Sequence, residues 1–176
     1  KSVLRDVLDK CKSELEILER DTSRLKMTVE TPFPRLTYSD AVKILKGEKD
    51  VDGRNSIKTL ESDLKELREK TDTVKKEILD REVKIKQAGV KKGEIDFNKN
   101  KIDILTGNLK ELEETEKNIP QWIESAKKFY AGGDFGGTDE TVLTRLFDVP
   151  VMVYNWPHAV KAFYMKRDEN DPELAK

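Results

Sequence analysis

The sequence lacks most of the features that would assign the chain to a class of protein directly. It has one cysteine, Cys11, and therefore no internal disulfide, which is typical of a protein from a reducing compartment. No apolar run approaches the roughly 20 residues that a membrane-spanning helix needs, and no signal peptide is present. The formal net charge is −1, so the whole chain has no basic field that attracts nucleic acid. These absences predict a cytoplasmic protein without a membrane partner.

Short motifs that carry chemistry are also missing. There is no Walker loop, no G-x-G-x-x-G fingerprint, no nucleophile elbow and no set of residues with metal-ligand spacing. The single histidine, His158, follows Pro157 in a predicted turn, which favours a structural or exposed role over that of a ligand or base. Glycine pairs at 132–133 and 136–137 can approach a phosphate, although such pairs more often form turns. We therefore predict no catalytic and no metal-binding residue in this chain.

The sequence is rich in charged residues: 39% of the residues are charged and 36% are hydrophobic. This is too polar for one compact globule and is typical of a chain that is partly long surface helix. Residues 54–88 follow a heptad pattern with two core positions. One position holds Ile57, Leu64, Thr71, Ile78 and Ile85, and the other holds Leu60, Leu67, Val74 and Arg81.

A second heptad pattern follows a glycine-bounded break at residues 89–93. Its core positions hold Ile95, Ile102, Leu109, Glu116, Ile123 and Tyr130 in one row, and Asn98, Leu105, Leu112, Ile119 and Ala126 in the other. Two such arrays joined by a turn predict an antiparallel helical hairpin with arms roughly 50 Å long. Pro120 lacks the backbone N–H of a helix interior, so we expect the second helix to break there and the hairpin to end near residue 119.

The segment before the hairpin predicts helix, strand and helix in turn. Apolar residues at three-and-four spacing predict a helix over residues 3–20, with the thiol of Cys11 on its buried stripe. Two prolines in residues 32–34 favour an extended path into a strand over 35–38. Ser39 is the predicted N-cap of the next helix, which stops near residue 47 and buries Ala41, Val42, Ile44 and Leu45.

The segment after the hairpin predicts one helix and two strands. Thr138 is a plausible N-cap, and acidic residues follow it in the first turn of the predicted helix. Residues 149–154 predict a buried strand, and the alternation over residues 161–166 predicts another. On that last strand Lys161 and Tyr164 lie on opposite faces. The Tyr164 hydroxyl either enters a cleft as a polar anchor or is buried in a core, and the pattern alone favours the core.

The tip of the hairpin is locally basic, with Glu94 and Asp96 its acidic residues. Its lysines are Lys84, Lys86, Lys91, Lys92, Lys99 and Lys101. Lys91 and Lys92 are candidates for contact with a phosphate backbone. A solvated end is the commoner role for such a tip, and charged heptad hairpins most often act as spacers or protein-binding arms.

Three segments of the chain resemble one family, the asparaginyl-tRNA synthetases. Pro32–Ala41 resembles the family's PF-x-R-[ILM]-T-Y-x-[DE]-A segment, and residues 133–141 resemble its acidic, glycine-containing lead-in to a helix. Pro150–Lys166 resembles the signature P-V-x-[VIL]-x-x-[YF]-P-x-x-[IV]-K-[AS]-F-Y-M-[KQ]. Aspartate-specific relatives typically read R-P-F-Y-T-M in this last segment, so the K-A-F-Y-M of residues 161–165 favours asparagine as the substrate.

The resemblance implies an α+β fold: a class II antiparallel sheet with flanking helices, interrupted here by the long antiparallel helical hairpin. It implies a cytoplasmic, homodimeric asparagine–tRNA ligase that activates asparagine with ATP and Mg²⁺ and transfers it to tRNA(Asn) in protein synthesis. It also implies a place for Tyr164 in the amino-acid pocket, which shifts the interpretation of Tyr164 from core to site.

The resemblance covers residues 1–49 and 131–176, whereas residues 50–130 are predicted to be an inserted coiled-coil hairpin. The family's ATP-binding arginine motifs and Mg²⁺-binding acidic residues lie outside these segments, as do the parts that form the dimer. We therefore expect the chain, which begins at Lys1, to be a fragment that is inactive alone. Two alternatives stay open: a non-catalytic coiled-coil interaction module, and a synthetase-like enzyme that makes asparagine by amidating aspartate.

Overall fold

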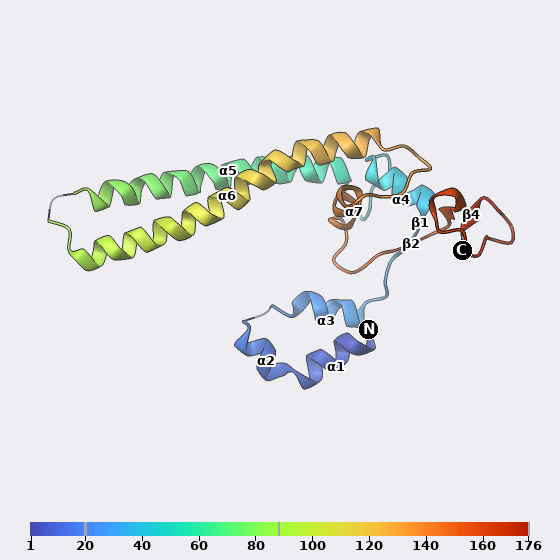
Figure 1. The fold of residues 1–176 in the computed structure, drawn as a ribbon, viewed down its shortest axis with the longest axis horizontal. Coiled ribbons are helices and arrows are strands. Elements are labelled where there is room, and N and C mark those ends of the chain that lie inside the picture. The colour runs from blue at the N-terminus through green and yellow to red at the C-terminus, as the bar shows by residue number, and fades with distance from the viewer. Residues whose placement is uncertain (20, 88, 176) are drawn as a thin grey trace. The chain divides into compact units, whose positions relative to one another are not determined.

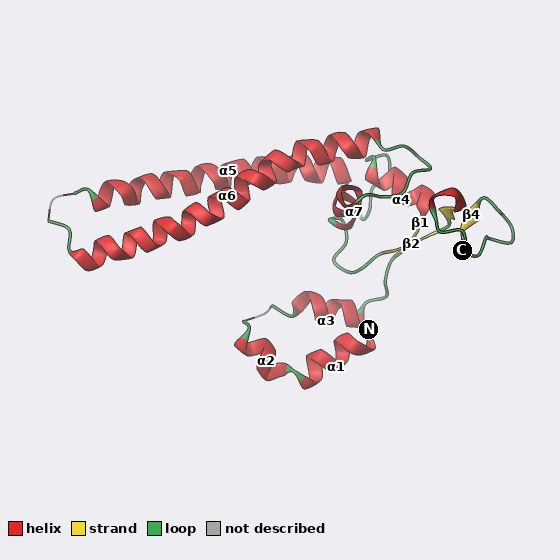
Figure 2. Cartoon of the chain, viewed as in Figure 1, coloured by secondary structure: helices red, strands yellow, loops and turns green. Residues whose placement is uncertain are grey.

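The computed structural model describes residues 1–19, 21–87 and 89–175, and the chain packs as two compact units. Unit 1 comprises Lys1–Ile57 and Ser125–Lys176, and unit 2 comprises Lys58–Glu124. Figure 1 traces the elements along the chain, and Figure 2 shows that helices dominate it, with short strands between them. Within the described residues, no helix is both long enough and apolar enough to span a bilayer.

The first residues of unit 1 form two short helices, α1 (Ser2–Lys10) and α2 (Lys12–Ile17). The single helix predicted over 3–20 is therefore wrong. Cys11 leaves the helical region with φ −111° and ψ 36° and ends α1, while its amide still bonds to the last turn. The thiol of Cys11 is half-buried rather than buried as predicted. Arg20, the predicted helix end, lies outside the described residues, as does Ala88 at the end of the first heptad pattern.

A third helix, α3 (Ser23–Glu30), packs against α1 and is not predicted by the sequence pattern. Its apolar residues Leu25, Met27 and Val29 alternate with polar ones, which is the period of a strand. The helix nevertheless begins at Ser23, whose amide donates a hydrogen bond to the carboxylate of Asp21, two residues earlier, at 2.9 Å. Bonds from the Ser23 hydroxyl and amide lower the pKa of Asp21.

Strand β1 (Arg35–Thr37) and helix α4 (Tyr38–Leu45) follow the prolines, close to their predicted positions. The N-cap of α4 is Thr37 rather than the predicted Ser39. The Thr37 hydroxyl oxygen accepts a hydrogen bond from the Asp40 amide at 3.1 Å, which satisfies one of the free N–H groups at the helix start. The predicted apolar face of this helix is buried, as its members show: Ala41, Val42, Ile44 and Leu45.

The last third of the chain begins with helix α7 (Gly137–Thr144), which starts one residue before the predicted cap, Thr138. Its N-cap is Gly136, whose amide donates to Oδ2 of Asp139 at 3.0 Å. Strand β2 (Met152–Tyr154) follows and lies within the strand predicted over 149–154, but the prediction that this strand is buried is wrong, because Met152 and Tyr154 are exposed.

The strands pair in two short sheets. β1 and β2 are parallel, with Leu36 opposite Val153, and β3 (Trp156–Pro157) is antiparallel to β4 (Leu174–Ala175). Parallel strands cannot be joined by a tight turn, and a long stretch of chain accordingly separates β1 from β2. The wider antiparallel sheet that the resemblance implies is not formed within the described residues and stays an expectation.

Residues 161–166 do not form the predicted strand. They follow a short 3-10 helix, η1 (His158–Val160), and continue as turns in which the Met165 amide bonds to the Ala162 carbonyl at 2.9 Å. Phe163 is 91% exposed, so the alternating apolar side chains of this segment do not face a core. An alternating pattern gives a strand only where a neighbouring strand is available to pair with it.

Two long helices, α5 (Ser56–Ile85) and α6 (Lys92–Lys128), supply unit 2. They run side by side in opposite directions, as Figure 1 shows. Ion pairs join them at Arg68–Glu116 (3.0 Å) and Lys75–Glu113 (2.8 Å). A position further along α5 therefore pairs with a position earlier on α6, which is the order that antiparallel helices require.

Burial along these helices follows the predicted heptad spacing. Every predicted core position from Ile57 to Ala126 is buried or half-buried. Tyr130, the last predicted position, is 78% exposed because α6 has already ended at Lys128. The predicted break at Pro120 is wrong, since α6 continues through it. Pro120 is exposed while its neighbour Ile119 is buried, so the proline ring lies on the solvent side of the helix and does not disturb the buried face.

Candidate functional site

Unit 1 contains a group of four aromatic rings, the aromatic cluster: Tyr38, Phe129, Phe135 and Trp156. Tyr38 stacks on Phe135 with ring centroids 5.4 Å apart, and Trp156 contacts these two rings at 5.1 and 5.0 Å. Phe129 adds a tilted contact to Phe135 at 5.2 Å. Tilted, edge-on and offset arrangements are those that aromatic pairs prefer. With Tyr38 only 7% exposed, the cluster is a packed centre rather than a surface patch.

The cluster joins the three segments that carry the family resemblance. Tyr38 belongs to the segment at β1 and α4, Phe135 to the loop before α7, and Trp156 to β3. These segments are far apart in the sequence, and side-chain packing in unit 1 brings them together. The signature residues therefore share one local structure.

A hydrogen-bonded clamp fixes the loop beside the cluster. The Tyr38 hydroxyl donates to the Gly133 carbonyl at 2.7 Å and accepts a hydrogen bond from the Gly132 amide at 2.8 Å. Burial raises the pKa of Tyr38, and the bond from the Gly132 amide opposes that rise. Gly132 has φ 111°, a conformation that favours glycine. The glycine pair thus forms a turn, held by a tyrosine hydroxyl.

One cation lies at the edge of the cluster. The Lys161 ammonium is 3.5 Å from the centroid of the Trp156 ring and 2.8 Å from Oδ1 of Asp134. The Lys161 side chain is 21% exposed and the Asp134 side chain 57%, so the pair lies between the cluster and solvent. A ring face and a carboxylate both attract an ammonium group. Together they hold the Lys161 charge in one place beside the clamped loop.

Within the described ranges, no group of three or more His, Cys, Asp or Glu side chains is placed to hold a metal ion. Mg²⁺ is bound in proteins through carboxylates together with substrate phosphates and water. We assign no chemical step to a metal in this chain. The site offers a positioned loop and a fixed cation, which suit binding and positioning.

Tyr164, the residue predicted for the amino-acid pocket, lies outside the aromatic cluster. Its side chain is 75% exposed, and its ring meets that of Phe163 edge-on at 5.5 Å. The prediction that Lys161 and Tyr164 lie on opposite faces of a strand is wrong, because no strand forms there. Only Lys161 of the two is part of the site described above.

The other residues singled out in the sequence lie elsewhere. Lys91 and Lys92 are exposed at the start of α6. His158 is half-buried in η1, and its amide bonds to the Glu173 carbonyl at 2.7 Å. The cluster tyrosine, Tyr38, belongs to one of the family motifs, but the sequence pattern alone does not identify it as a functional residue. The feature of the sequence that could identify it is its position where a predicted strand ends and a predicted helix begins.

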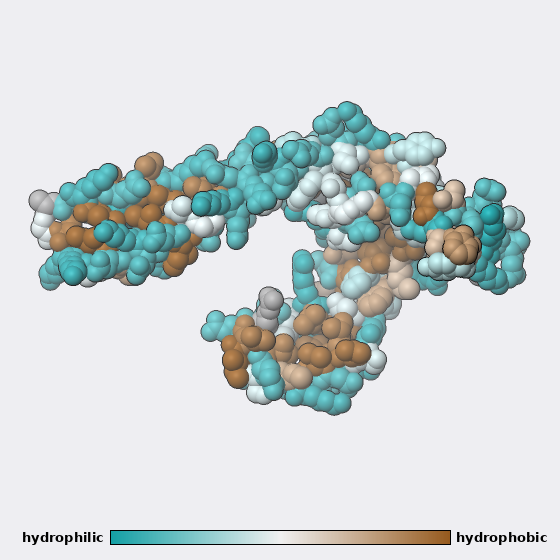
Figure 3. Space-filling model, viewed as in Figure 1, coloured by the Kyte–Doolittle hydropathy of each residue, from teal (hydrophilic) through white to brown (hydrophobic). Residues whose placement is uncertain are grey.

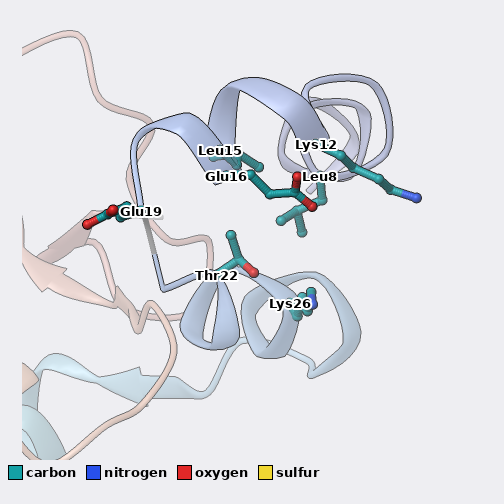
Figure 4. A pocket seen from close by; sticks show the side chains of 7 residues that line it. All are labelled: Leu8, Lys12, Leu15, Glu16, Glu19, Thr22 and Lys26. Carbon is teal, nitrogen blue, oxygen red and sulfur yellow. The ribbon is translucent and has the colours of Figure 1, made fainter.

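A cavity of about 280 Å³ lies among the N-terminal helices, away from the residues of the cluster. Figure 4 shows its lining side chains: Leu8, Lys12, Leu15, Glu16, Glu19, Thr22 and Lys26. Figure 3 shows apolar side chains gathered over α1, α2 and α3, where Val3, Ile17 and Leu18 are exposed. The mixed charges of the lining and the lack of a buried side chain in α1 and α2 give no ligand chemistry.

The model of the family described as tRNA synthetases class II (D, K and N) matches residues 1–176, and the chain belongs to this family. Among its curated relatives is the asparagine–tRNA ligase of Sorangium cellulosum, which is 31% identical over 173 residues. That of Herpetosiphon aurantiacus is 32% identical over 174 residues, and that of Koribacter versatilis is 26% identical over 173.

These alignments cover 98%, 99% and 98% of this chain but 24%, 24% and 23% of the relatives. The chain thus spans about a quarter of the length of the curated relatives it matches. Because nearly the whole chain is aligned, the alignments run through the segment of α5 and α6 as well as the flanking segments.

Proposed function

We propose that this chain is part of an asparagine–tRNA ligase, which activates asparagine with ATP and transfers it to tRNA(Asn). The observation that carries the proposal is the aromatic cluster, in which Tyr38, Phe135 and Trp156 unite the three signature segments. The relatives named above support the same substrate. The chain's own part is to position one side of the substrate pocket.

Tyr164 is proposed to line the amino-acid pocket, as the resemblance implies. Phe163, Tyr164 and Met165 are consecutive and are 91%, 75% and 39% exposed. A run of exposed large side chains is typical of a surface that meets a ligand or another part of a protein. We infer that this run is covered by asparagine and by the rest of the domain in the complete enzyme.

ATP, Mg²⁺ and the homodimer contact are assigned to parts of the enzyme outside this chain. The described residues offer no acidic group of three or more for the metal. We therefore expect the 176-residue chain to show no amino-acid-dependent exchange of pyrophosphate into ATP by itself.

The test is pyrophosphate exchange by the full open reading frame that contains this chain, with asparagine, aspartate and lysine offered separately. Exchange with asparagine is expected. Exchange with aspartate alone, or with none of the three, would overturn the proposal, and amidation of aspartate would support the asparagine-synthesising alternative. Asparagine-dependent exchange by the isolated chain would show that the chain is not an inactive fragment.

The role of Tyr164 is tested in the same enzyme with a matched control. Tyr164→Ala is expected to raise the KM for asparagine at least about tenfold, the scale of one lost polar contact in a site. Tyr130→Ala removes a tyrosine of similar exposure, 78%, and is expected to leave KM unchanged. Equal effects of the two variants would contradict the assignment.

Lys91 and Lys92 are proposed to contact tRNA. Both are exposed, and both lie where the chain enters α6. Phosphate contact by lysine is independent of base sequence, so this contact would add affinity rather than select tRNA(Asn).

A further inference from the structure

We propose that the tip of the hairpin, residues 84–101, is an RNA-binding site that holds backbone phosphates with lysines and an unstacked base on Phe97. The proposal rests on the proposed function only for the identity of the RNA as tRNA. Phe97 lies within the lysine-rich segment and is 56% exposed, which is unusual for a phenylalanine.

Charge is sharply segregated along the two helices. The tip has six lysines and two acidic residues, a net charge of +4. The remainder of unit 2, residues 58–83 and 102–124, is called the shaft and has nine basic and fourteen acidic residues, a net charge of −5. A polyanion is therefore attracted to the tip and repelled by the shaft. The net charge of −1 for the whole chain does not reveal this segregation of charge.

The tip lysines are available for a partner. All six are exposed, and none forms an ion pair in the part of the chain that the structure describes. Two shaft cations, by contrast, form ion pairs between the helices: Lys75 pairs with Glu113 at 2.8 Å, and Arg68 with Glu116 at 3.0 Å. Part of the charge of the shaft thus joins its helices, whereas no tip lysine forms an ion pair among the described residues.

Helix geometry places cation and ring together on α6. Lys101 follows Phe97 by four residues, so the two side chains share one face of the helix. Lys92 and Lys99 are seven residues apart, which is two turns or roughly 10 Å along the same helix. Lysines beside an exposed ring are the combination by which proteins hold single-stranded or looped RNA, because every base has a stacking face.

The test measures binding of the 176-residue chain to a fluorescent tRNA(Asn) transcript by anisotropy, between about 50 and 200 mM salt. Lys91→Glu with Lys92→Glu is expected to weaken binding at least about tenfold and to reduce the slope of log K against log salt by about two. The control, Lys110→Glu with Lys117→Glu, makes the same change of net charge on the shaft. It is expected to have a much smaller effect.

The ring is tested separately. Phe97→Ala is expected to weaken binding by about tenfold without changing the salt slope, the effect of losing one stacked base. Leu79→Ala removes an apolar side chain of similar exposure, 60%, and is expected to have no effect. Circular dichroism establishes that each variant keeps its helices. If Lys91→Glu with Lys92→Glu loses helical structure, Lys91→Gln with Lys92→Gln is used in its place.

Three results would overturn the proposal: equal losses from tip and shaft variants, no loss from either tip variant, or tighter binding to polyglutamate or to phosphatidylserine vesicles than to RNA. The first would indicate attraction by net charge alone, and the last would assign the tip to a protein or a membrane surface. Pyrophosphate exchange by the full enzyme needs no tRNA. Failure of the tip site leaves that exchange intact, and failure of the ligase proposal leaves RNA binding intact.

Discussion

The Tyr38 hydroxyl lies 2.7 Å from the carbonyl oxygen of Gly133, a residue that follows it by 95 positions in the sequence. This bond connects the start of α4 to the loop that leads into α7. The same hydroxyl accepts a bond from the Gly132 amide, so one side chain closes the turn from both sides. The loop that carries Asp134, and through it Lys161, depends on this contact.

Tyr38→Phe is expected to lower the free energy of unfolding of unit 1 by about 1–3 kcal/mol, because two backbone groups lose their partner while the ring stays. Urea unfolding followed by Trp156 fluorescence in a Trp122→Phe background measures it. Tyr130→Phe removes an exposed hydroxyl and serves as the control. Equal stabilities for Tyr38→Phe and the parent would show that water replaces the clamp at no cost.

Alkaline pH is expected to weaken unit 1 through the same residue. Burial raises the pKa of Tyr38 above its usual value of about 10, so the folded state keeps the proton at a pH where the unfolded state loses it. The contribution of Tyr38 is complete below about pH 10 and declines as pH rises through the folded pKa. The stability difference between the parent and Tyr38→Phe should therefore shrink as the pH rises above about 10, and a constant difference would contradict this.

Gly47→Ala is expected to destabilise unit 1 more than Gly53→Ala does. Both glycines have positive φ, 75° and 76°, so both substitutions carry the strain of a left-handed conformation, about 1–2 kcal/mol. At Gly47 an added Cβ would lie 2.9 Å from Cγ1 of Ile57, whereas the space around Gly53 is open. Thermal unfolding of the two variants isolates this crowding, and similar melting temperatures would show that Ile57 can move aside.

Thr71→Val is expected to stabilise unit 2 by about 1 kcal/mol. The Thr71 hydroxyl is buried and finds no hydrogen-bond partner among the described residues, and valine has nearly the same shape. Thr73→Val is the control, because the Thr73 hydroxyl is exposed and already donates to the Glu69 carbonyl at 2.8 Å. Urea unfolding followed by circular dichroism decides the point; a loss of stability at position 71 would indicate a partner such as a bound water.

Unit 2 shows what the sequence alone predicts well. Its contacts lie between two helices whose heptad spacing can be counted, so every predicted core position from Leu60 to Ile123 is correctly assigned a buried or half-buried place. The error at Pro120 has a physical reason. A proline prevents one hydrogen bond, but an exposed proline in a long, otherwise satisfied helix does not end it.

Unit 1 was predicted less well because its elements depend on partners distant in the sequence. Residues 161–166 have the alternation of a strand but pair with no strand among the described residues, and α3 has that alternation yet forms a helix. The capping error at α4 was small, since Thr37 and Ser39 are both favourable caps and only the path of β1 chooses between them. The sequence pattern indicates which kinds of secondary structure are possible, and tertiary packing determines which of them forms.

The sequence indicates the segments of the candidate site only through their resemblance to family motifs, and not through periodicity or spacing. The motifs identify the segments that meet, but the contacts of Tyr38 with Phe135 and Trp156 join residues distant in the sequence, which no local pattern predicts. The pair of Lys161 and Asp134 was missed for the same reason. Tyr164, chosen by resemblance, stays a prediction for the complete enzyme.

The parallel pairing of β1 and β2 sets an order of events during synthesis. A ribosome releases Leu36 long before its partner Val153 exists, and all of α5 and α6 emerges in between. Contacts between neighbouring helices form faster than pairing between distant strands. The hairpin is therefore expected to fold before β1 can pair with β2. A strand that is synthesised before its partner can pair with a wrong segment. Because β1 is only three residues long, it offers few backbone groups for such pairing.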